Sequence, residues 1–94
     1  MPNTFEVVRA EALFASNLQS SDAPAARQVR YAVATTLRRL GIRGCATQVA
    51  GEFGEHPETA VARMAWALVT VRTAYRSVYR RRSARTSAPL SLAS

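Results

Sequence analysis

The arginines of the second half of the chain are the residues whose type and spacing point most directly to chemistry. All six acidic residues lie within residues 1–58, and six arginines in the same segment balance their charge. The net charge of +7 therefore arises entirely from Thr59 onward. Guanidinium groups pair with phosphates, and a segment of one sign attracts the opposite charge. The segment carries seven arginines and is predicted either to attract phosphate or an acidic protein surface or to be a solvated basic tail. The predicted phosphate contacts are Arg72, Arg76, Arg80, Arg81 and Arg82.

Two tyrosines, Tyr75 and Tyr79, alternate with these arginines. Aromatic rings can stack on bases while neighbouring guanidinium groups bind the phosphate backbone. The same arrangement also suits a soluble helix, in which the aliphatic stems of arginines cover the tyrosine rings. Both interpretations follow from the sequence.

Cys45 and His56 carry the remaining reactive side chains. A thiol at a helix N-terminus has a lowered pKa, but a nucleophile needs a neighbouring base. One cysteine and one histidine do not complete a zinc site within a single chain. The four glycines fit no nucleotide-binding spacing. We therefore expect no enzyme, no metal and no cofactor, with Cys45 buried as a small apolar residue.

The elements that position these residues are predicted to be four helices, which makes the fold class all-α. The apolar spacing favours a first helix over residues 3–16, with Phe5 and Phe14 in the core. Asn3 and Glu6 resemble a capping box, so Asn3 is predicted to cap this helix. A second helix is capped by Asp22 or Ser21, has Pro24 in its first turn, and stops at Gly41. A short third helix follows over 45–53, and a long fourth helix begins at Pro57.

Residues 44–68 resemble a helix-turn-helix unit. Ala50 is small enough to let two helices cross closely, and Gly54, four residues later, suits a left-handed turn. The apolar anchors expected in the recognition helix, Val61 and Met64, come one residue late for the usual pattern. The sequence therefore predicts a helix-turn-helix-like unit; either its turn is one residue longer, or the match in spacing is a coincidence.

In such a unit, the start of the fourth helix would enter a DNA groove. His56, Thr59 and Arg63 are the candidate base or phosphate contacts, with Arg63 as the reader of guanine. Glu55 and Glu58 oppose this interpretation because carboxylates repel phosphate, although acids at a helix start also stabilise the helix dipole.

The fourth helix also carries a seam with heptad spacing. The seam predicts either the central helix of the domain or a homodimer, since a small chain does not readily cover such a helix alone. With Trp66 on a neighbouring face, the candidate interface residues are Trp66, Leu68, Val71, Tyr75 and Val78.

The chain is predicted to hold one helical domain over residues 1–82 and a disordered tail over 83–94, where serine, alanine and proline occur without periodicity. The single cysteine forms no internal disulfide, and no apolar run approaches the ~18 residues that span a membrane. Charged residues at positions 6, 9 and 11 interrupt any signal peptide. We expect a cytoplasmic protein.

Three runs carry a resemblance to known sequences: ALFAS at 12–16, LGIRGCA at 40–46 and EFGEHPETAVARMAWA at 52–67. Across about residues 10–72, the chain resembles a family of small actinomycete proteins, many of them from Streptomyces-like bacteria. The resemblance implies a bacterial cytoplasmic setting and assigns no functional residue, and the arginine-rich tail lies outside it.

Two hypotheses follow for the function. The first is a small DNA-binding or DNA-associated regulator that uses the helix-turn-helix-like unit and the basic C-terminal helix. The alternative is a helical protein-interaction module, a homodimer or a partner-binding regulator, that does not bind nucleic acid.

Overall fold

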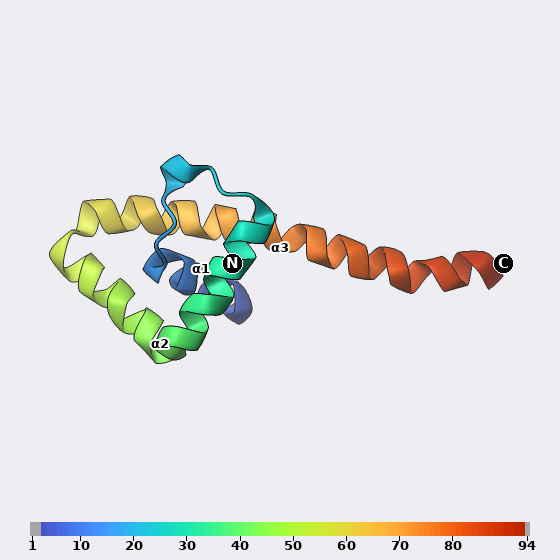
Figure 1. Cartoon of the computed structure of the whole chain (residues 1–94), viewed down its shortest axis with the longest axis horizontal. Coiled ribbons are helices and arrows are strands. Elements are labelled where there is room, and N and C mark those ends of the chain that lie inside the picture. The colour runs from blue at the N-terminus through green and yellow to red at the C-terminus, as the bar shows by residue number, and fades with distance from the viewer. Residues whose placement is uncertain (1–2, 94) are drawn as a thin grey trace.

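The computed structural model describes the backbone of residues 3–93 and the side chains of residues 3–76. Its elements are α1 (Thr4–Ala15), the short 3₁₀ helix η1 (Ser20–Asp22), α2 (Ala26–Glu55) and α3 (Pro57–Ala93), as Figure 1 shows. The described backbone contains no strand. The prediction of an all-α fold is confirmed.

The first helix, α1, forms the centre of the domain. In Figure 1, the two arms of the bent helix α2 and the first part of α3 form three sides of a triangle around α1. Ala10, Ala12 and Leu13 of α1 are completely buried. They form one apolar cluster with Val29, Val33 and Cys45 of α2 and Ala67, Val71 and Ala74 of α3. Small side chains let all three helices approach one another closely in this core.

The start of α1 agrees with the sequence, since the side chain of Asn3 accepts a hydrogen bond from the Glu6 N–H at 2.8 Å. Phe14 is buried as predicted. Phe5, however, is 68% exposed, so its expected place in the core was wrong. The buried residues of α1 begin only at Ala10, because the first turns of the helix lie outside the packed triangle.

The segment expected to form the second and third helices is one element, α2, with a sharp bend at Gly41. Its φ of 74° and ψ of 170° lie in a region that is essentially restricted to glycine. The helix resumes directly after the bend, without the expected break before Cys45. The four-helix count is therefore not confirmed, and the described residues form three α-helices and η1.

The start of α2 also differs from the expectation. Pro24 precedes the helix, which begins at Ala26, and Asp22 belongs to η1. The Asp22 carboxylate accepts a hydrogen bond from the Gln19 N–H at 2.9 Å, so it caps the 3₁₀ turn instead of α2.

A single residue, His56, joins α2 to α3. Its N–H donates to the Glu52 carbonyl at 2.7 Å, and its own carbonyl accepts from the Ala60 N–H at 2.9 Å. Gly54 lies inside α2, and among the glycines of the described backbone only Gly41 has a positive φ. Ala50 is exposed, and no atom lies within 4 Å of a Cβ added at Gly54. The close crossing expected of a helix-turn-helix is therefore not supported.

The long helix α3 begins at Pro57, as predicted, and leaves the triangle in its second half (Figure 1). The predicted domain limit at residue 82 and the disorder predicted for residues 83–94 lie beyond the side chains that the structure describes. Both stay predictions.

Candidate nucleic-acid interface

Arg63, the candidate reader of guanine, is hydrogen-bonded to the protein's own backbone. Its Nε donates to the Phe14 carbonyl at 2.9 Å, and its Nη2 donates to the Ser16 and Leu18 carbonyls at 3.1 and 2.9 Å. The carbonyls in the last turn of a helix have no N–H donor within the helix, and the carbonyls of the loop that follows also lack helical donors. Arg63 therefore caps the C-terminus of α1 and holds the following loop against α3.

Aromatic rings surround the same guanidinium. Its Cζ lies 5.6 Å from the centre of the Phe14 ring and 5.1 Å from that of Trp66, at distances typical of cation–π contacts. Burial lowers the pKa of Arg63, and the nearby Glu52 acts in the opposite direction. The structure gives Arg63 a structural role, because its Nε and Nη2 donors are already bound to carbonyls.

His56 and Thr59, the other candidate groove contacts, are both exposed near the start of α3. Glu55 and Glu58 are exposed beside them, and the His56 Nε2 lies 4.0 Å from a Glu55 oxygen. This corner of the triangle thus combines two carboxylates with one weakly basic ring. Its charge does not favour phosphate, and base contacts by His56 and Thr59 stay a prediction.

The phosphate-binding candidates begin where α3 leaves the triangle. Arg72 Nε lies 3.3 Å from a Glu6 carboxylate oxygen, whereas Arg76 is exposed and has no hydrogen bond or ion pair among the described side chains. The side chains of Arg80, Arg81 and Arg82 lie outside the described part of the chain. Of the five predicted phosphate contacts on α3, the structure therefore places Arg72 against an acid and leaves Arg76 accessible.

Two arginines that the sequence assigned to no site meet α3 at the same place. Arg9 of α1 lies over the ring of Tyr75, 4.0 Å from its centre, and Arg30 of α2 donates to the Ala74 carbonyl at 2.9 Å. Burial raises the pKa of the Tyr75 hydroxyl, while Arg9 and Arg30 partly offset this effect. Together with the Arg72–Glu6 pair, these contacts fix the base of the projecting helix to both other helices.

The candidate dimer interface is largely used within the chain. Val71 is 1% exposed and belongs to the central cluster, and Trp66, Leu68 and Tyr75 are half-buried against that cluster. The side chain of Val78 lies beyond the described residues. Because α1 and α2 already cover this seam, the described part of the chain does not offer it as a free surface for a second copy.

Cys45 is completely buried in α2, four positions after the non-helical Gly41. Burial raises the pKa of its thiol, Glu11 acts in the same direction, and Arg39 acts against them. The burial of Cys45 is as predicted, and the raised pKa does not favour a reactive thiolate. Within residues 3–76, no group of three or more histidine, cysteine or acidic side chains is placed to hold a metal ion.

Comparisons with protein-family models, with curated proteins and with solved structures found no match to this chain. The resemblance to small actinomycete proteins therefore stays a prediction. In the described part of the chain, no helix has the length and apolarity needed to cross a membrane.

Proposed function

We propose that the protein associates with nucleic acid by binding phosphates with the basic, projecting part of α3. The observation that carries this proposal is the departure of α3 from the triangle near the point where its sequence becomes arginine-rich, in a segment that has carried no acidic residue since Glu58 (Figure 1). With a rise of 1.5 Å per residue, the helix from Arg72 to Arg85 extends over about 20 Å. Six arginines lie within that length, which favours several simultaneous phosphate contacts.

The contacts at the base of this helix support the proposal. Arg9, Arg30 and Arg72 are held by Tyr75, Ala74 and Glu6, respectively, so they attach α3 to the triangle. A helix held at its base presents its charges with less loss of conformational freedom than a flexible tail does. Arg76 is the first arginine along α3 that is accessible and has no acidic partner.

The helix-turn-helix-like unit at 44–68 contributes less to this proposal. Arg63 is bound to carbonyls of the chain, and two carboxylates flank His56 and Thr59. We therefore infer a DNA-associated regulator whose affinity comes mainly from phosphate contacts, which position a protein without reading bases.

The test compares two triple variants that lose equal charge. One is R80A/R81A/R82A; the other is R38A/R39A/R43A, which removes three exposed arginines near the bend of α2. Each phosphate contact contributes about 0.9 of a decade of affinity at about 0.1 M salt, so the first variant, which loses three contacts, should bind a random-sequence duplex about 500-fold more weakly. The second should bind nearly as well as the parent protein.

Equal losses in the two variants would show that net charge alone attracts the duplex, and would contradict a site on α3. An absence of binding by the parent protein at low salt would contradict the proposal entirely.

A further inference from the structure

A second surface lies on the first arm of α2, away from the arginine-rich part of α3. There, a pocket of about 620 Å³ opens between residues 16–18 and the outer face of the helix. Four of its lining residues recur every fourth position, which places them along one face of the arm: Arg27, Tyr31, Thr35 and Arg39.

The middle of this groove is apolar. Tyr31 is 71% exposed, an unusual position for a large aromatic side chain, and Leu18 and Ala32 line the groove beside it. The hydroxyl of Thr35 donates within its own helix, to the Tyr31 carbonyl at 3.0 Å and the Ala32 carbonyl at 3.2 Å. The centre therefore suits a large apolar side chain of a partner.

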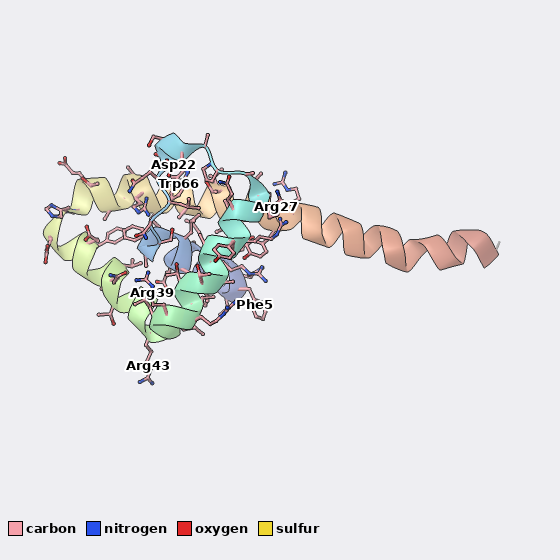
Figure 2. The ribbon with its side chains drawn as sticks, viewed as in Figure 1. Phe5, Asp22, Arg27, Arg39, Arg43 and Trp66 are labelled. Carbon is pink, nitrogen blue, oxygen red and sulfur yellow. The ribbon has the colours of Figure 1, made fainter. Side chains whose placement is uncertain are left out.

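The two ends of the groove are positive. Arg27 and Arg39 are twelve residues apart on the helix, or about 18 Å along its axis, and Figure 2 labels them toward opposite ends of this arm. Neither guanidinium has a hydrogen bond or an ion pair among the described side chains. No acidic residue lines the groove. Arg30, Arg63 and Arg72, in contrast, are each bound by other groups of the chain.

We propose that this groove binds a peptide segment of a partner protein, with a large apolar residue at its middle and an acidic residue on each side. An extended chain rises about 3.3 Å per residue, so carboxylates six positions apart span about 20 Å and match the two arginines. Guanidinium groups form strong paired hydrogen bonds with carboxylates. Nucleic acid fits less well, because its closely spaced phosphates would leave the apolar centre unfilled. This proposal does not depend on phosphate binding by α3.

The loop that forms one wall of the groove is fixed before any partner arrives. The carbonyls of Ser16 and Leu18 accept hydrogen bonds from Arg63, and the Ser16 hydroxyl donates to the Leu13 carbonyl at 2.6 Å. The wall therefore needs little further ordering when a peptide binds, which favours affinity.

The test is a titration of the full-length, ¹⁵N-labelled protein with a capped seven-residue peptide. The peptide has a central leucine, aspartate at both ends and serine elsewhere, and a control peptide has asparagine in place of aspartate. We expect saturable amide shifts within residues 16–18 and 27–39, and binding of the control peptide at least 10-fold weaker, because its neutral amides form weaker hydrogen bonds with arginine.

Variants with matched charge separate the groove from net charge. R27A/R39A should lower the affinity at least 10-fold, whereas R38A/R43A, which removes two exposed arginines outside the groove, should change it less than about 2-fold. Tyr31→Ala should weaken binding with no change in net charge.

Several outcomes would overturn the proposal. These are the absence of saturable shifts, equal binding of both peptides, and equal losses in the two double variants. Shifts of the same amides on simple concentration of the protein would assign the groove to a second copy instead. If a random-sequence duplex displaced the peptide from the groove of the R80A/R81A/R82A variant, the groove would be assigned to nucleic acid.

Discussion

The Nε of Arg63 donates to the carbonyl oxygen of Phe14 at 2.9 Å, across 49 positions of sequence. This contact joins α3 to the end of α1, and the same guanidinium binds the carbonyls of Ser16 and Leu18. One side chain thus terminates the central helix and fixes the loop that lines the groove on α2. The local fold here depends on a charged guanidinium group that is hydrogen-bonded to backbone carbonyls.

Arg63→Ala should destabilise the protein strongly. The substitution leaves carbonyls at the end of α1 without their charged donor and removes the cation–π contacts with Phe14 and Trp66. The expected loss is about 2–4 kcal/mol of unfolding free energy. It is measured by urea unfolding, with the exposed Arg76→Ala as a control that should change the free energy by less than about 0.5 kcal/mol. A loss in Arg63→Ala as small as in the control would contradict this role.

Two glycines of α2 should respond to alanine in opposite directions. Gly41 has a φ of 74° and a ψ of 170°, so Gly41→Ala forces a side chain into a strained conformation and should cost about 1–3 kcal/mol. Gly51 is within the helix, and nothing lies within 4 Å of an added Cβ. Gly51→Ala should therefore stabilise the protein by about 0.5–1 kcal/mol. The two thermal midpoints check this prediction, and shifts of the same sign would contradict it.

Cys45 should make stability fall in alkaline solution. Burial holds the pKa of its thiol above the ordinary value, so the folded protein retains a proton that the unfolded chain loses. Its contribution is fully present below the unfolded pKa, about pH 8.5, and is lost as the pH rises through the folded pKa. Urea unfolding at pH 8 and pH 10 should show this decrease, and Cys45→Ala should reduce it. Burial also raises the pKa of Tyr75, which lowers stability in the same way at higher pH, and this effect remains in the Cys45→Ala variant. An identical decrease in Cys45→Ala would contradict the assignment.

Glu6→Gln should separate stability from binding. The Glu6–Arg72 pair is partly exposed, and such pairs contribute only about 0–1 kcal/mol, so the variant should fold almost as stably as the parent. Without its acidic partner, Arg72 becomes available to phosphate. The slope of log affinity for duplex against log salt should then steepen by about one contact, or ~0.9. An unchanged slope would show that Arg72 lies outside the nucleic-acid site.

Local signals in the sequence predicted the parts of the fold that depend on neighbouring residues. The Asn3 cap, the interruption of helical geometry at Gly41 and the start of α3 at Pro57 each follow from the conformational preferences of one residue type. Sequence periodicity also indicated which face of α3 is apolar.

The sequence did not predict which elements pack against the apolar face of α3. Spacing shows that Val71 must be covered, but it does not distinguish α1 and α2 of the same chain from a second copy. Likewise, the backbone carbonyls that bind Arg63 become its neighbours only after folding. No residue type marks such carbonyls in the sequence, so this contact could not be predicted. The groove beside Tyr31 arises for the same reason, from a loop packed near a helix face.

The most direct test of nucleic-acid binding is its salt dependence, measured with a random-sequence duplex from about 50 to 300 mM salt. If Arg76, Arg80, Arg81, Arg82 and Arg85 each contact a phosphate, log affinity should fall against log salt with a slope of about −4 to −5. R80A/R81A/R82A should reduce the slope to about −2. A slope near zero, or the same slope in this variant and its parent, would contradict phosphate binding by the basic part of α3.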